Sequence, residues 1–240
     1  MEKKNISNEL IFGRNPIREA LKNNRIIRVF ATNSFSDTEL IKNIKDKNIP
    51  LVYKNNNELS KMVDGVHQGI VAEVKRYEYS SLEEILRIAK KEVNPLIIIL
   101  DEINDPHNLG AIMRSCDVFG AVGIIVKKHH QALLNSTVAK TSAGAINYVK
   151  IAQVPNLVQT IKLLKENGFW VISADGSATT LYQDLKYDFP VALVIGNEGS
   201  GISRLIIENS DYVVKIPMEG KINSLNASVA AAVLMSRIKN

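Results

Sequence analysis

The chain has 240 residues, of which 45% are hydrophobic, and it carries a formal net charge of +5 with a pI near 9.1. This length and hydrophobicity allow one large buried core or two small ones, and the positive charge favours an anionic partner. The charge is uneven, because residues 1–79 carry 14 Lys and Arg against 10 Asp and Glu.

The composition also excludes several classes of protein. The single cysteine, Cys116, cannot form an intramolecular disulfide, and no set of Cys and His residues has the spacing of zinc ligands. No apolar run approaches the ~20 residues that a membrane helix needs, and no apolar signal region follows the first residues. We therefore expect a soluble, cytoplasmic protein from a reducing compartment.

The first third of the chain alternates between helical spacing and strand-sized apolar runs. The segments are 15–23 (helix), 27–31, 37–47 (helix), 51–53, 57–63 (helix) and 70–74. This alternation predicts a small α/β domain over residues 1–79. Residues 80–94 are charged and helical, with Ser80 or Ser81 as N-cap and Glu83 or Glu84 about three residues on, which predicts a linker helix.

Residues 95–240 alternate more regularly and predict a second α/β domain. Strand-like apolar runs lie at 96–100, 123–126, 148–151, 169–173, 191–195 and 212–216, and a last helix covers about 226–238. Uninterrupted apolar strands separated by helices are typical of a parallel sheet that helices cover on both faces.

The first segment that can carry chemistry is NDPHNLGAIMRSCDVFG, at residues 104–120. We expect Asn108 as the N-cap of a helix whose Arg114 points away from its apolar face. That apolar face consists of Leu109, Ile112, Met113, Cys116 and Phe119. A helix N-terminus with an Asn cap and an Arg can hold a phosphate, although an ordinary amphipathic helix with a solvated Arg has the same pattern.

The second segment is VALVIGNEGSGISRL, at residues 191–205. Its glycines, Gly196, Gly199 and Gly201, permit a tight turn and close backbone approach by a ligand. Their order matches neither the dinucleotide fingerprint nor the phosphate-binding loop of nucleotide hydrolases. Glu198 within the turn is the informative residue, because open α/β sheets bind ligands beyond the carboxyl ends of their strands.

The third segment is KIPMEGKINSLNASVAAAVLM, at residues 215–235. A strand ends at Pro217, a polar loop follows, and Ser224, Leu225 and Asn226 lead into an Ala-rich helix. The small residues of this helix would let another backbone come close. A capped, tightly packed C-terminal helix explains the same composition.

Taken in order, these three segments resemble the three sequence motifs of SpoU-type RNA 2′-O-methyltransferases, from about residue 95 to the C-terminus. The stretches IFGRNPIREAL and VHQGIVAEV in the first third are similar to the N-terminal domain of bacterial 23S ribosomal RNA guanosine 2′-O-methyltransferases. The resemblance implies a parallel α/β sheet with a trefoil knot in its C-terminal segment. It also implies a preceding RNA-binding domain that resembles ribosomal protein L30.

The resemblance further implies S-adenosylmethionine as cofactor, held by the backbone around Gly196, Ile216 and Leu225, and it implies neither a metal nor DNA. Family members act as homodimers with the active site near the interface. The implied reaction transfers methyl to a ribose 2′-hydroxyl, with a 23S rRNA guanosine favoured by the wording of the front domain. The same motifs fit tRNA or an rRNA adenosine as substrate, and a non-enzymatic L30-like RNA-binding protein is the alternative from another class.

Arg114 matches the catalytic arginine of this family. A guanidinium has a pKa above ~12, so we interpret Arg114 as a clamp for a phosphate or oxyanion, whereas other proposals for the family make it the base. By motif position, four further residues orient Arg114, the ribose and the cofactor loops: Asn108, Glu198, Ser224 and Asn226.

Five other chemistry-bearing residues receive structural interpretations. We expect His67, His129 and His130 on turns, and Cys116 and Trp170 in packed positions.

Overall fold

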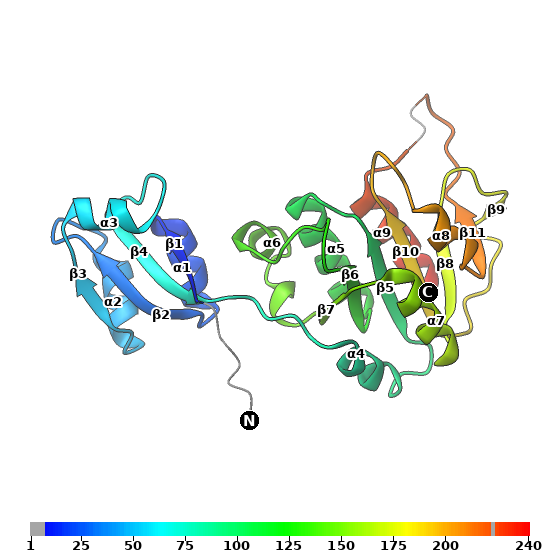
Figure 1. The fold of residues 1–240 in the computed structure, drawn as a ribbon, viewed down its shortest axis with the longest axis horizontal. Helices are drawn as coiled ribbons and strands as arrows, with labels where there is room; N and C mark the ends of the chain where they lie inside the picture. The colour runs from blue at the N-terminus through cyan, green and yellow to red at the C-terminus, as the bar shows by residue number, and fades with distance from the viewer. Residues whose placement is uncertain (1–7, 222–223) are drawn as a thin grey trace. The chain divides into compact units, whose positions relative to one another are not determined.

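The computed structural model describes residues 8–221 and 224–240, and the chain divides after Glu78 into two compact units (Figure 1). Each unit has its own sheet and its own core. Across the described residues, no helix is long and apolar enough to cross a membrane.

The first unit is a four-stranded sheet in the order β1-β4-β2-β3. Its strands are β1 (Asn8–Phe12), β2 (Ile26–Ala31), β3 (Leu51–Tyr53) and β4 (Ile70–Lys75), and its helices are α1 (Arg14–Lys22), α2 (Thr38–Asp46) and α3 (Asn56–Met62). β4 runs antiparallel to β1 and β2, whereas β2 and β3 are parallel. Strand β1 is an addition to the sequence-based expectation, and the other elements lie within a few residues of it.

Opposite faces of this sheet are covered by different helices. Ile17 of α1 and Leu40 of α2 pack with Val29 on one face, and Leu59 of α3 packs with Phe30 on the other. These buried residues alternate along β2, because successive strand side chains point to opposite faces. His67 is buried in the turn before β4, where its ring accepts from the backbone N–H of Gly69 and bonds Ser60, as expected for a structural turn residue.

The second unit contains a seven-stranded sheet in the order β7-β6-β5-β10-β8-β11-β9, and every neighbouring pair is parallel. Its strands are β5 (Leu96–Asp101), β6 (Gly123–Lys127), β7 (Ile151–Val154), β8 (Trp170–Ala174), β9 (Thr180–Leu181), β10 (Val191–Gly196) and β11 (Tyr212–Lys215). The predicted parallel α/β sheet is therefore confirmed.

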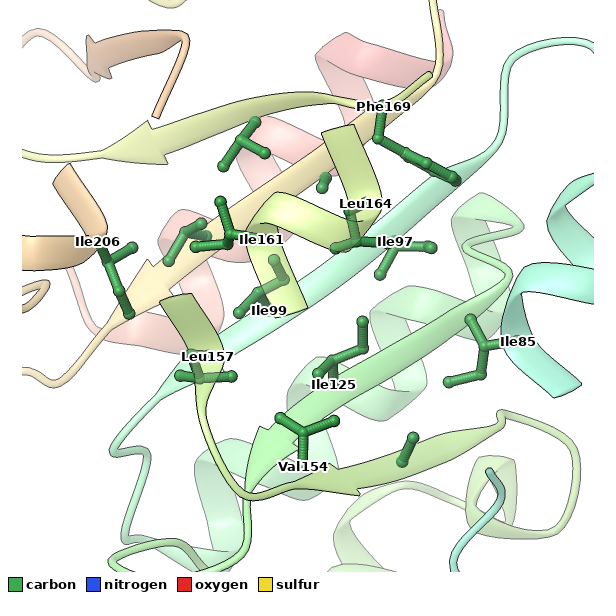
Figure 2. Close-up of a cluster of buried hydrophobic side chains, with 14 of the residues drawn as sticks. Ile85, Ile97, Ile99, Ile125, Val154, Leu157, Ile161, Leu164, Phe169 and Ile206 are labelled. Carbon is green, nitrogen blue, oxygen red and sulfur yellow. The ribbon is translucent and has the colours of Figure 1, made fainter. Parts of the chain in front are cut away.

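Helices cover both faces of this sheet. They are α4 (Leu82–Ala89), α5 (Pro106–Phe119), α6 (Ser136–Thr141), α7 (Leu157–Glu166), α8 (Arg204–Glu208) and α9 (Ala227–Lys239). Figure 2 shows Ile161 and Leu164 of α7 over Ile97 and Ile99 of β5, in a buried cluster that also includes Ile85 of α4. Because Ile98 alternates with Ile97 and Ile99, it faces the other layer, where α5 packs against both α9 and α6.

Three local expectations differ from the structure. Asn108 is not an N-cap, because α5 begins at Pro106 and the carboxylate of Asp105 accepts from the N–H of His107, a start that suits proline at the first helical position. β7 begins at Ile151 rather than at residue 148, since a short 3-10 helix, Ala145–Asn147, precedes it. The helix expected as a linker is α4, whose Ile85 lies in the core of the second unit.

Candidate active site

The candidate site lies at the carboxyl edge of the parallel sheet, where two central strands end side by side. β5 and β10 are paired, and the register aligns Asp101 with Gly196 at their last positions. The segment leading to α5 and the glycine-rich turn after β10 therefore leave the sheet next to each other. This edge is the place at which open α/β sheets bind ligands.

Three side chains from distant parts of the sequence meet here in one hydrogen-bonded cluster. The amide Nδ2 of Asn108 donates to Glu198 Oε1 over 2.7 Å, and the amide Nδ2 of Asn226 donates to the same oxygen over 2.5 Å. Asn226 Nδ2 also donates to Asn108 Oδ1 over 2.9 Å. The three segments that the sequence singled out thus converge on the carboxylate of Glu198.

Asn226 is oriented by its second task, which is to cap α9. Its Oδ1 accepts from the backbone N–H of Ser228 at 2.9 Å and from the Ser228 hydroxyl at 2.6 Å. With the oxygen facing the helix, the Nδ2 group points toward Glu198 and Asn108. One amide therefore couples the start of α9 to the carboxylate cluster.

Asn108 reaches Glu198 because of where α5 begins. With Asp105 as cap, Asn108 lies inside the first turn, and its side chain is 6% exposed. Its amide is therefore free to bond across to the glycine-rich turn instead of satisfying the end of its own helix.

The glycine-rich turn is fixed by residues that the sequence reasoning missed. Asn197 Oδ1 accepts from the N–H of Gly199 at 2.8 Å, and Asn197 Nδ2 donates to the carbonyl of Glu102 at 2.9 Å. The buried carboxylate of Asp101 accepts from the N–H of Ser203 at 2.7 Å. Polar side chains at the very ends of predicted strands were the available signal for both Asn197 and Asp101.

Gly196 meets a backbone requirement in this turn. A Cβ built on Gly196 would lie 2.4 Å from the carbonyl carbon of Gly201, because the turn folds back and pairs Asn197 with Gly201. No larger residue fits at this position without moving the turn.

A cavity of about 700 Å³ opens beside the cluster. The predicted site residues that line it are Gly196, Glu198, Ile216, Ser224 and Leu225. Aliphatic side chains of Ile195, Met218 and Ala230 also line it, together with the carboxylate of Asp175. Its volume lies in the range of ~300–1,000 Å³ that small-molecule sites occupy.

Arg114 lies apart from this cluster. It is exposed on α5, and within residues 8–221 and 224–240 it forms no hydrogen bond or ion pair. At about 100° per residue, the six positions between Asn108 and Arg114 put the two side chains on different sides of the helix. The structure therefore brings together Asn108, Glu198 and Asn226 without Arg114.

Comparison with known proteins identifies the family. The model of the SpoU rRNA Methylase family matches residues 95–236, and the model described as RNA 2′-O ribose methyltransferase substrate binding matches residues 10–80. The chain belongs to the SpoU rRNA Methylase family. It is an enzyme of the S-adenosylmethionine-dependent RNA methyltransferases, and S-adenosylmethionine is its cofactor.

Relatives cover nearly the whole chain. Protein YacO of Bacillus subtilis (strain 168), whose name assigns it to the TrmH family of tRNA/rRNA methyltransferases, is 42% identical over 96% of this chain and 94% of its own. A Staphylococcus aureus (strain MSSA476) protein with the same family name is 40% identical over 95% and 94%. The crystal structure of the SpoU methyltransferase AviRb from Streptomyces viridochromogenes with AdoMet shares the fold, with a TM-score of 0.75, 23% identity, and coverage of 96% and 89%.

The residues around the cavity fit this cofactor by their chemistry. S-adenosylmethionine combines an adenosine with a cationic sulfonium and an amino-acid group. The cavity supplies aliphatic side chains such as Ile216 and Leu225, the backbone of the Gly196–Gly201 turn, and the carboxylates of Asp175 and Glu198. In the described residues, no group of three or more His, Cys, Asp or Glu side chains could hold a metal ion.

Proposed function

We propose that this enzyme transfers the methyl group to a ribose 2′-hydroxyl, and that its substrate is a guanosine of 23S ribosomal RNA. The observation that carries the proposal is the cluster of Asn108, Glu198 and Asn226 beside a cavity lined by Gly196 and Leu225. Three motifs of the family supply these residues, and each contributes at one edge of one sheet.

When bound, S-adenosylmethionine supplies a methyl group on a cationic sulfonium that a nucleophile can take. The chain must hold a ribose hydroxyl in line with that methyl group and accept charge as the proton leaves. Glu198 is a fixed acceptor for this task, because the amides of Asn108 and Asn226 hold one of its oxygens. Ser224 lines the same cavity and offers a hydroxyl that can orient the ribose.

Arg114 completes the proposed machinery as a cationic clamp. Its guanidinium stays protonated and presents several N–H donors to a phosphate or a developing oxyanion. The guanidinium is exposed and without an internal ion pair in the part of the chain that the structure describes, so it is available to RNA. Proton removal then falls to the RNA phosphate or to another group and not to the arginine.

The proposal includes a homodimer formed through α5 and α9, the two helices that pack together on one face of the sheet. Val118 on α5 is 69% exposed and Val229 on α9 is 46% exposed, so both helices offer apolar side chains outward. Arg114 shares the exposed side of α5 with Val118, and a partner there would bring Arg114 to an interface.

Two features of the proposed fold go with this function. The first is a trefoil knot in the C-terminal segment, supported by Asn226, which follows β11 in the chain yet bonds both Asn108 and Glu198. The second is an L30-like, RNA-binding first unit over residues 1–79, supported by its mixed four-stranded sheet and by the substrate-binding family match over residues 10–80. In this proposal, residues 80–94 connect it to the methyltransferase domain at 95–240.

The test is transfer of labelled methyl from S-adenosylmethionine to total rRNA and tRNA isolated from a strain that lacks the enzyme. Label recovered as 2′-O-methylguanosine in 23S rRNA would support reaction and substrate together. Label in tRNA, or on adenosine, would keep the reaction and replace the substrate. Absence of label in every RNA, together with no cofactor binding by calorimetry, would favour a non-enzymatic RNA-binding protein.

A further inference from the structure

A run of basic residues borders the candidate site without taking part in it. Lys127, Lys128, His129 and His130 follow β6 directly, and the chain from 127 to 135 contains no acidic residue. β6 pairs with β5, aligning Val126 with Leu100, so this run leaves the sheet beside Asp101 and Glu102. We name residues 128–130 the basic loop.

The backbone of the basic loop is held at both ends. The N–H of Lys128 donates to the carbonyl of Val154 at 2.9 Å. At the other end, Gln131 Nε2 donates to the carbonyl of Ile103 at 2.7 Å, and Gln131 Oε1 accepts from the N–H of Ile103 at 3.2 Å. The loop is therefore fixed to the sheet edge.

The same two-residue segment holds the basic loop and the glycine-rich turn. Glu102 accepts the amide of Asn197 through its carbonyl, and its neighbour Ile103 bonds Gln131. Consecutive Cα atoms lie 3.8 Å apart. The basic loop and the turn that carries Glu198 are thus attached to adjacent residues at one edge of the sheet.

The charges of the basic loop are not neutralised by the protein. Lys127 pairs with Glu102 at 3.4 Å, which satisfies the nearest carboxylate. Lys128, His129 and His130 are all exposed, and their side chains have no hydrogen bond or ion pair among residues 8–221 and 224–240. Exposed, unpaired cations at the rim of a site raise the local concentration of an anionic substrate.

We infer that the basic loop contacts the RNA phosphate backbone next to the nucleotide that is methylated. This inference rests on the proposed function, because it assigns the substrate of that site a second contact. Lysine binds phosphate as a point charge, and the imidazole rings add N–H donors. The loop adds affinity and register and leaves base identity to other residues, since phosphate contacts carry no sequence information.

The test compares a basic-loop variant with a matched variant far from the site. Lys128→Gln, His129→Gln and His130→Asn are combined, with asparagine at 130 because the φ of His130 is 56° and asparagine tolerates that region. The control is Lys90→Gln with Lys91→Gln, two exposed lysines at the end of α4, just before β5 begins and hence at the opposite edge of the sheet.

With total rRNA as the probe, the basic-loop variant should raise the KM for RNA roughly tenfold and lower the salt dependence of RNA binding by ~0.7 per lost phosphate contact. The kcat at saturating RNA and the affinity for S-adenosylmethionine should stay within about twofold. Lys128→Glu alone should weaken RNA binding more than Lys128→Gln, an order that follows charge and not loop structure.

The inference is overturned if the wild type methylates rRNA while the basic-loop variant has its KM and salt dependence. It is equally overturned if the Lys90 and Lys91 control loses as much RNA affinity. A wild type that methylates and binds no RNA would overturn the proposed function, and this inference with it.

Discussion

Asn226 Nδ2 lies 2.5 Å from Glu198 Oε1, so the residue that caps α9 also holds the carboxylate of the glycine-rich turn. A helix start and a candidate catalytic group are therefore one structural feature. Changes at Asn226 can separate the two tasks, because the cap uses Oδ1 and the cluster uses Nδ2.

We predict that Asn226→Ser and Asn226→Ala both lower methyl transfer by about tenfold or more, because each removes the Nδ2 donor from Glu198 and Asn108. Serine still caps a helix and alanine does not, so the alanine variant should be less stable by about 1 kcal/mol, or roughly 2–4 °C in Tm. Turnover and thermal melting of the two variants check this. Full activity in the serine variant would remove the cluster from the mechanism.

Arg114→Ala should lower kcat by at least about 100-fold while leaving the affinity for S-adenosylmethionine within about twofold. The reason is that Arg114 is exposed on α5 and is not among the residues that line the cavity. Single-turnover methylation and calorimetry measure the two quantities. Arg204→Ala is a suitable control, since Arg204 is exposed and pairs only with Glu208 in the described structure. Near-normal turnover of Arg114→Ala would exclude this residue from catalysis.

Gly196→Ala should abolish cofactor binding and lower Tm, because the new methyl group would lie 2.4 Å from the backbone of Gly201. Gly176→Ala is the matched control: Gly176 also lines the cavity, but a Cβ there meets nothing within 4 Å. We expect its Tm to change by less than about 2 °C. Equal stability of both variants would show that the turn can move away from Gly196.

Cys116 should resist thiol reagents in the native protein and react only after unfolding. Its thiol is fully buried between α5 and α9, 3.9 Å from the sulfur of Met235, and burial raises its pKa far above the ordinary value. Because the folded-state pKa is raised, this contribution to stability is complete below pH 9.0 and is lost as the pH rises beyond it. Denaturant unfolding of Cys116→Ala should show a smaller loss of stability at alkaline pH than the wild type, and an identical loss would contradict this assignment.

Removal of residues 1–79 should weaken RNA binding by at least about tenfold and leave S-adenosylmethionine binding unchanged. The cavity is lined entirely by residues of the second unit, whereas the substrate-binding family match covers residues 10–80. Filter binding with rRNA and calorimetry with the cofactor measure the two affinities. An unchanged RNA affinity would refute an RNA-binding role for the first unit.

The sequence by itself determined the elements and the class of fold. Apolar runs such as 96–100 and 191–195 can only be strands buried on both faces, and they became β5 and β10 at the centre of a parallel sheet. Family resemblance added Asn108, Glu198 and Asn226 as site residues, although nothing local to each segment shows that they meet. The helix start was wrong by a few residues, because Asp105 and Asp105-Pro106 compete successfully with Asn108 for the cap.

Only the tertiary structure decided how these residues act together. The bonds among Asn108, Glu198 and Asn226 span up to 118 positions in the chain, so they exist only after β5 and β10 align and α9 packs beside α5. The same long-range packing gave Asn197 and Asp101 their tasks and left Arg114 on an exposed surface. Local propensities act over a few residues, whereas side-chain geometry in a site depends on which strands become neighbours.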